Sequence, residues 1–352
     1  MNTIIHERPG VYSVYDASGV TPGGRAPRAI GLAARASQGE AGKAVTVTGS
    51  AAGTAVFGDE GDLPALLELL FAGGASSVTA VRVADPGTLE DYRAAFAALD
   101  REDVQLLLCD STAEEVQQAL KEAAESASAA RRERIALAGC EAEASVEDLL
   151  ERAKALNCER VVLAGPGVLD RSGKTLSGAY AAAAVAALAA SVQDPALPIH
   201  GGTLPGLGGL TQDYTDGDID RLVRGGVTPL ESVGGTVSPV RAVTTRTSTG
   251  GSPDASWREL TTIFIVDDVI PAVRRALRSK FARSKNTPRS RAAIRSQVIV
   301  ELERKLAEEI ISGYSGVTVT PSEEDPTVCL VEFGFSVAHG LNQLRLTVHI
   351  EI

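Results

Sequence analysis

Long apolar runs and an export signal are both missing from this sequence. No segment approaches the ~20 consecutive apolar residues that a membrane-spanning helix needs. The richest apolar run, residues 179–192, is mostly alanine and is too short. The first ten residues, MNTIIHERPG, contain no basic stretch followed by an apolar one. We therefore expect neither membrane insertion nor a secretory signal, and we expect the chain to fold in the cytoplasm.

Closely spaced metal ligands are also missing. The four cysteines lie far apart without a Cys-x-x-Cys pair, and the four histidines show no ligand spacing. Zinc sites use close ligand pairs, and disulfide scaffolds are short and rich in cysteine. Three of the cysteines lie in or beside apolar segments, which predicts small core residues. We expect no metal and no cofactor. The cysteines are Cys109, Cys140, Cys158 and Cys329.

One segment imitates a nucleotide-binding loop. Residues 165–175 follow an expected strand, end in Gly-Lys-Thr and precede an expected helix. Five residues separate Gly167 from Gly173, whereas a phosphate-binding loop needs four, because successive N–H groups must converge on one phosphate. Asp170 would also repel the anion, and a dinucleotide site would need a glycine where Asp170 stands. We expect a plain connection and no enzyme, with a nucleotide-binding α/β enzyme using the Gly167–Thr175 loop as the alternative.

Residues 28–250 predict an α/β body. Short apolar strands alternate with helices, a pattern typical of a mostly parallel sheet covered by helices. Ser111 and Glu114 have the spacing of a capping box at the start of one helix. The expected strands are residues 29–34, 77–83, 104–109, 134–138 and 160–164. The expected helices are residues 62–72, 89–99, 111–130, 145–156 and 177–191.

Residues 251–340 predict a smaller α+β domain with two helices packed on a small sheet. A strand over residues 260–266 leads to a helix that Asp267 caps, with Pro271 in its first turn. Residues 289–312 predict a second helix that ends before Gly313. The first helix has an apolar stripe of Val269, Val273, Leu277 and Phe281. The expected strands are residues 316–320, 328–337 and 343–352.

The basic residues are concentrated in one segment, although the net charge is −11. Between Val269 and Val300 there are nine cations and no acidic residue, while the rest of the chain has 25 cations against 45 acids. Such an asymmetry predicts a surface that meets an acidic partner. The cations expected to form this surface are Arg274, Arg275, Arg278, Lys280, Arg283 and Lys285.

Two other interpretations of the basic segment stay open. It could be a solvated helix face, or it could bind nucleic acid, for which a basic cluster is the usual footprint. Against nucleic acid, its single aromatic residue, Phe281, belongs to the apolar stripe. The acidic chain would also repel a long phosphate backbone. We therefore expect an acidic protein surface and no nucleic acid.

Both ends of the chain contain β-prone segments without a nearby hairpin partner. Residues 343–352 alternate apolar and polar side chains, which predicts a strand with one buried face. Near the N-terminus, a β-prone run at residues 11–15 precedes a Gly- and Pro-rich hinge at residues 18–27. The last strand could be the edge of its own sheet, but a long unguarded edge also invites strand addition. We predict two strand arms, 1–27 and 341–352, exchanged between subunits. The exchange residues are Ile4, Val11, Tyr12, Val14, Leu344, Leu346, Val348, Ile350 and Ile352.

Several segments, taken in order, resemble the contractile tail sheath proteins of phages, R-type bacteriocins and related injection systems. The sequence Glu-Arg-Pro-Gly-Val-Tyr at residues 7–12 resembles the Pro-Gly-Val-Tyr opening of that family. Residues 225–230 and 241–247 resemble the strands before its C-terminal domain, and residues 263–275 resemble its basic helix. Each motif alone has low specificity, and their order carries the resemblance. The sequence lacks the bulky aromatic residues usual in the family around residues 241–246.

The resemblance implies a structural subunit that polymerises helically, as stacked rings, around an inner tail tube protein. The sheath would contract and drive the tube through a target envelope. Residues 251–340 would face the tube through the basic residues, residues 28–250 would lie outside, and the arms would join neighbouring subunits. Baseplate and tail terminator proteins are the other implied partners. Assembly is expected in the bacterial cytoplasm, and the product would be a virion tail or a released injection particle.

Overall fold

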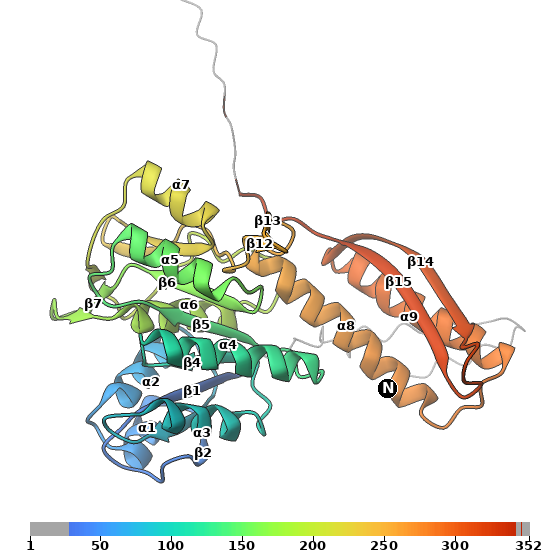
Figure 1. The fold of residues 1–352 in the computed structure, drawn as a ribbon, viewed down its shortest axis with the longest axis horizontal. Coiled ribbons are helices and arrows are strands. Elements are labelled where there is room, and N and C mark those ends of the chain that lie inside the picture. Colours follow the sequence, from blue (N-terminus) through green and yellow to red (C-terminus); the bar gives the residue numbers. More distant parts are fainter. Residues whose placement is uncertain (1–27, 343–345, 347–352) are drawn as a thin grey trace, which may run out of the picture.

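The computed structural model describes residues 28–342 and Leu346; residues 1–27, 343–345 and 347–352 lie outside this part. Figure 1 shows a body of sheet and helices, from which a long helix and a β-hairpin extend to one side. We call residues 260–342 the C-terminal unit and the residues before them the body. Most of the body's core consists of the apolar strands and helices that the sequence predicts.

The body contains an eight-stranded sheet in the order β11-β10-β6-β5-β4-β1-β3-β2. The six central strands are parallel, and β2 and β11 pair antiparallel at the two edges. The predicted mostly parallel α/β sheet is thus confirmed, and both edge strands were missed. The strands are Ile30–Arg35 (β1), Ala44–Val47 (β2), Val78–Val83 (β3), Leu106–Cys109 (β4), Ile135–Gly139 (β5), Val161–Gly165 (β6), Val227–Val233 (β10) and Thr236–Pro239 (β11).

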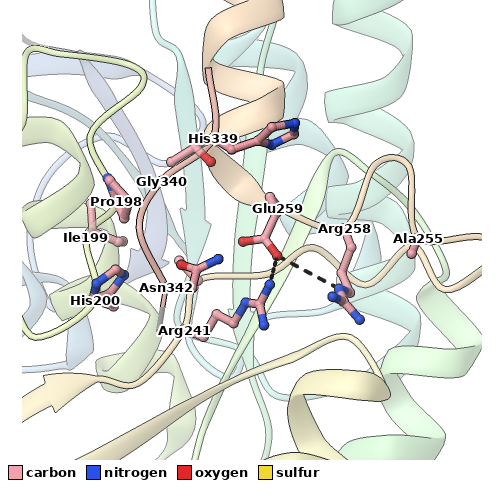
Figure 2. Close-up of a pocket in the computed structure, with 12 residues that line it drawn as sticks. Pro198, Ile199, His200, Arg241, Ala255, Arg258, Glu259, His339, Gly340 and Asn342 are labelled. Atoms are coloured by element: carbon pink, nitrogen blue, oxygen red, sulfur yellow. Dashed lines mark hydrogen bonds and ion pairs between the residues drawn. The ribbon is translucent and has the colours of Figure 1, made fainter. Parts of the chain in front are cut away.

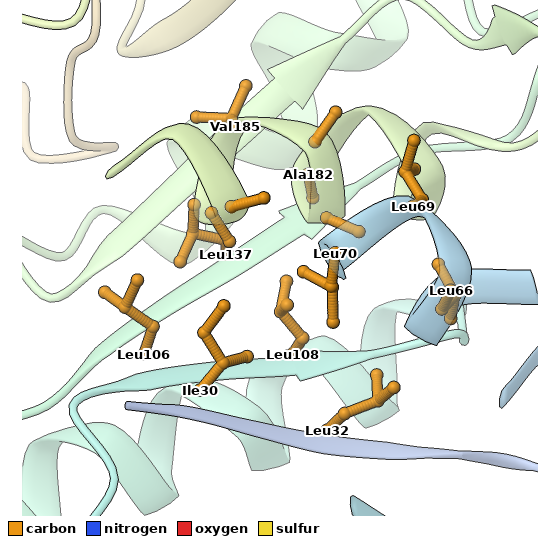
Figure 3. Close-up of a cluster of buried hydrophobic side chains, with 14 of the residues drawn as sticks. Ile30, Leu32, Leu66, Leu69, Leu70, Leu106, Leu108, Leu137, Ala182 and Val185 are labelled. Carbon is orange, nitrogen blue, oxygen red and sulfur yellow. The ribbon is translucent and has the colours of Figure 1, made fainter. Parts of the chain in front are cut away.

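Helices cover both faces of this sheet, because alternate strand residues point to opposite sides. Ile30 and Leu108 pack on the side of α2 and α6, as Figure 3 shows, whereas Leu107 and Ala136 pack on the side of α3, α4 and α5. Cys109, Cys140 and Cys158 are buried, as predicted, and Cys329 is half-buried. The helices are Ser50–Phe57 (α1), Asp62–Ala72 (α2), Leu89–Leu99 (α3), Glu114–Ala129 (α4), Val146–Leu156 (α5), Gly178–Ser191 (α6) and Asp216–Arg224 (α7).

The alanine-rich run is helix α6, and it lies buried between the sheet and α2. Small side chains allow this close packing. A Cβ placed on Gly139, at the end of β5, would lie 2.0 Å from the carbonyl oxygen of Gly178, at the start of α6. Any larger residue at position 139 would therefore push the helix off the sheet.

The C-terminal unit has its own apolar core. Val269 and Val273 of α8, Val298 and Leu302 of α9, and Ile311 of β14 form its buried centre. The antiparallel pair β14–β15 covers α9 on one side. The elements are Leu260–Phe281 (α8), Pro288–Ala307 (α9), Ile311–Pro321 (β14) and Cys329–Val337 (β15).

The predicted strand over residues 260–266 is wrong, because these residues form the first two turns of α8. Leu260 and Phe264 pack on the body core, whereas Ile265 packs on the core of the C-terminal unit. A helix that is apolar on two sides reads as a continuous apolar run, which resembles a buried strand. Pro271 consequently lies inside the helix and not in its first turn.

Two predicted helix ends are also wrong. Helix α9 ends at Ala307, and Gly313 lies within β14. Glu309 adopts φ 56°, and the N–H of Ile310 donates to Lys305, so a non-glycine residue takes the left-handed position after the helix. At α4, the N-cap residue is Ala113 and no side chain caps the helix, so the capping box at Ser111 does not form.

Candidate assembly surfaces

The predicted basic surface lies on the C-terminal half of α8 and on the turn into α9. Arg275, Arg278 and Arg283 are exposed, as is Lys285. Among the described residues, none of these four side chains has a hydrogen-bond or ion-pair partner. The four cations are therefore available to an external anionic surface.

The other two predicted cations have partners inside the chain. Arg274 donates to Glu133 at 2.8 Å and to the carbonyl oxygen of Arg131, so it ties α8 to the body. Lys280 is exposed but donates to Oε1 of Gln297 on α9. The structure brings five of the six side chains to one end of the C-terminal unit, and Arg274 lies apart from them in the contact with the body.

The hairpin β14–β15 presents open edges. Among the described residues the sheet has two strands, so the outer edge of each strand lacks a β-strand partner. Phe333 and Phe335 stack with ring centroids 6.4 Å apart and stay half-buried over α9, while Leu330 on the other face is 47% exposed. A half-covered apolar face beside open edges fits strand addition from another chain.

The residues predicted to exchange between subunits lie almost entirely outside the described part of the chain. Of the nine, Leu346 is described, and its side chain is 88% exposed. The predicted exchange at the other eight positions stays a prediction. These positions are Ile4, Val11, Tyr12, Val14, Leu344, Val348, Ile350 and Ile352.

Ion pairs join α8 to the body, and the sequence did not predict them. Arg160, just before β6, donates to both oxygens of Asp267 at 2.5 and 2.7 Å. Burial raises the pKa of Asp267 to about 6, and this effect exceeds the opposing effect of Arg160. The sequence predicted that Asp267 would cap the start of a helix. An acidic residue inside an apolar run was the available signal for a buried partner.

A buried polar network fills the carboxyl end of the sheet between β1 and β4. In doubly wound sheets, ligands bind at this point, where the strand order reverses. Here the guanidinium of Arg35 lies between Asp110, at 2.7 Å, and Asp62, at 2.6 Å. Tyr92 donates to Asp110 at 2.6 Å, and Tyr180 donates to Asp62 at 2.8 Å. Burial raises the pKa of Asp110, more than these hydrogen bonds lower it. The protein thus occupies this position with its own side chains.

The segment that imitates a nucleotide-binding loop is a hairpin formed by Val168–Leu169 (β7) and Thr175–Leu176 (β8). The carboxylate of Asp170 accepts hydrogen bonds from the N–H groups of Ser172, at 2.8 Å, and Lys174, at 2.9 Å. These N–H groups are therefore engaged by an internal acid. A plain connection was expected, and the geometry gives no support to phosphate binding there.

The described residues contain no group of three or more His, Cys, Asp or Glu side chains placed to hold a metal ion. None of their helices is both long and apolar enough to cross a membrane.

Two family models match the chain. Residues 87–245 match the phage tail sheath protein central domain, and residues 252–351 match the phage tail sheath C-terminal domain. A tail sheath protein of Bacillus phage SP01 is 29% identical over 255 residues, which cover 70% of this chain and 43% of the relative. The chain thus matches less than half the length of this relative.

Solved sheath structures share the fold at low sequence identity. A sheath tail protein from Listeria innocua has a TM-score of 0.74 at 12% identity, with 89% of this chain and 92% of that chain covered. The helical sheath of the anti-feeding prophage in its contracted state has a TM-score of 0.71 at 15% identity, with 99% and 100% covered. A chain in the baseplate structure of the same particle has a TM-score of 0.73 at 15% identity, with the same coverage.

Proposed function

The chain belongs to the phage tail sheath family, and we propose that it is the structural subunit of a contractile sheath. In this proposal it polymerises helically around an inner tube and contracts to drive the tube through a target envelope. It catalyses no reaction and uses no cofactor. The observation that carries the proposal is the hairpin β14–β15, whose open edges and half-covered apolar face fit strands from neighbouring copies.

Strand exchange would hold the copies together. Residues 1–27 and 341–352 would act as arms that add strands to the hairpin of a neighbour, while residues 28–250 and 251–340 would form the outer and inner domains. Complete burial of the five apolar side chains of the last strand would contribute on the order of 7–15 kcal/mol before entropic costs. An arm of this strength keeps subunits joined while their rigid bodies change their packing.

The exposed cations of the C-terminal unit would face the tube. Arg275, Arg278 and Arg283, with Lys280 and Lys285, lie at one end of α8 and in the turn that follows it. Charged contacts between exposed groups set the register of two surfaces and weaken with salt, so they can break when the sheath slides. The proposal assigns an acidic protein surface to the tube and no contact with nucleic acid. Arg274 is left out of this surface because it contacts Glu133.

The remaining proposed partners and the proposed place of assembly are those that the family resemblance implies. The sheath would begin on a baseplate and end at a tail terminator protein, without inserting into a membrane itself. The fold shared with a chain of the anti-feeding prophage baseplate structure supports the baseplate contact. Assembly would take place in the bacterial cytoplasm, and the sheath would leave the cell as part of a virion tail or an injection particle.

The last strand provides a test with a matched control. Replacing its apolar positions Leu344, Leu346 and Val348 with serine removes the face that would be buried in a neighbour. Replacing the intervening polar positions Gln343, Arg345 and Thr347 with alanine changes the same segment on its other face. The serine variant should stay folded by circular dichroism but fail to pellet as polymer in an ultracentrifuge, whereas the alanine variant should pellet. Equal pelleting of the two variants would refute strand exchange.

A further inference from the structure

A cavity of about 310 Å³ lies where the C-terminal unit joins the body. The loop after α6, the turn into α8 and the segment after β15 form its wall, as Figure 2 shows. On this wall, Gly340 packs so closely on Pro198 that an added Cβ would lie 2.1 Å from the Pro198 Cγ. A ligand in the cavity would therefore contact both the body and the C-terminal unit.

Backbone pairing fixes the two segments that carry the charged side chains of this cavity. Val243 and Glu259 form an antiparallel bridge. The N–H of Thr244 donates to Arg258, and the N–H of Leu260 donates to Ala242, so the turn before α8 is fixed against the segment after β11. A backbone that is already fixed reduces the ordering that a bound ligand would have to impose.

The cavity has an excess of hydrogen-bond donors. Arg241 donates to Oε1 of Glu259, and Nε of Arg258 lies 3.9 Å from the same oxygen (Figure 2). The Nε atoms of Arg241 and Arg258 are buried and have no acceptor among the described residues. Glu259 is the single acid among the described residues that line the cavity. Two guanidinium groups therefore share one carboxylate, which leaves positive charge and unused donors.

Two further features of the wall favour an anion. Thr261 lies in the first turn of α8, and the N-terminal end of a helix this long carries partial positive charge. His200 and His339 add imidazole groups from the body and from the segment after β15. Donors thus come from several directions on both units, as expected of a binding site for oxygen ligands.

We propose that this junction cavity binds a small free oxyanion, a carboxylate or phosphate species, between the guanidinium groups of Arg241 and Arg258. The bound anion would accept hydrogen bonds from the accessible N–H groups of these two guanidinium groups and would strengthen the contact between the body and the C-terminal unit. Because the site lies within one chain, this proposal is independent of the one on sheath assembly.

The test is calorimetric titration of the purified full chain with inorganic phosphate and, separately, citrate, with chloride used to match ionic strength. Saturable binding with a Kd below about 10 mM is expected for at least one of the two. Arg258→Gln should weaken binding about tenfold, the usual effect of losing one charge-assisted hydrogen bond. Glu259→Gln should strengthen it, because the internal carboxylate no longer competes for Arg241. Arg93→Gln, which removes an exposed arginine outside the cavity, should leave the affinity unchanged.

The two cavity variants separate a binding site from a structural cluster. If Arg241, Arg258 and Glu259 serve stability alone, both variants will lower the melting temperature without changing any anion affinity. Absence of saturable binding to the wild-type chain would overturn the proposal, as would binding that Arg93→Gln weakens as much as Arg258→Gln. Opposite shifts of affinity in Arg258→Gln and Glu259→Gln, with unchanged circular dichroism, would support it.

Discussion

Replacing Asp110 with alanine should destabilise the body by about 2–4 kcal/mol. The side chain of Asp110 is fully buried and accepts hydrogen bonds from Tyr92 and Arg35. Loss of the acceptor leaves the buried hydroxyl of Tyr92 unpaired, which costs about 1–3 kcal/mol. Arg35 keeps Asp62, and its side chain is 35% exposed, so its share is about 1 kcal/mol.

Urea unfolding, followed by circular dichroism, measures this loss. The matched control is Glu90→Ala, which removes an exposed ion pair to Arg93 and should change the free energy of unfolding by less than about 0.5 kcal/mol. A second arm uses Tyr92→Phe, which should cost about 1 kcal/mol alone. Once Asp110 is alanine, the same change should instead recover about 1–3 kcal/mol, because it removes the unpaired hydroxyl.

Either of two results would refute this reasoning. If Asp110→Ala loses no more stability than Glu90→Ala, the network between β1 and β4 does not stabilise the fold. If the costs of Asp110→Ala and Tyr92→Phe simply add, the two side chains do not act through their shared hydrogen bond.

Two further predictions concern the C-terminal unit. Reversing the charge of Arg275 and Arg278 to glutamate should reduce cosedimentation with the tube protein. The interaction of the wild type with the tube protein should weaken as the salt concentration rises. If the variant and the wild type cosediment equally at every salt concentration, the assigned surface is contradicted. The raised pKa of Asp267, about 6, predicts a contribution to stability that is present at low pH and lost as pH rises through 6, because the folded state holds the proton more tightly than the unfolded state. From about pH 4 to about pH 7, the urea midpoint of the wild type should therefore fall relative to that of Asp267→Asn. If the urea midpoints of the two proteins change in parallel with pH, Asp267 does not titrate in this range.

The sequence predicted those parts of the fold that short-range patterns determine. Apolar runs such as Leu106–Cys109 gave the central strands of the body, and the periodicity of α9 gave the second helix of the C-terminal unit. The edge strand β2 was missed because its four residues are mostly only partly buried and lack a strong apolar signal. The start of α8 was misread because two cores bury opposite sides of it.

The candidate site was less predictable, because its contacts join residues far apart in the chain. The sequence places the basic residues on one helix and the following turn, but it does not show that Arg274 contacts Glu133, 141 residues away. The same holds for Arg35 and Asp110, which are 75 residues apart, and for the charged groups of the junction cavity. Such pairs become visible once the strand order brings the segments together.

The most direct test of the central proposal is negative-stain electron microscopy of the purified chain, alone and with its tube protein. A sheath subunit should form striated hollow cylinders whose axial repeat corresponds to stacked rings, and with the tube protein present the cylinders should enclose a tube. Discrete small particles under both conditions, from protein that is folded by circular dichroism, would contradict the account.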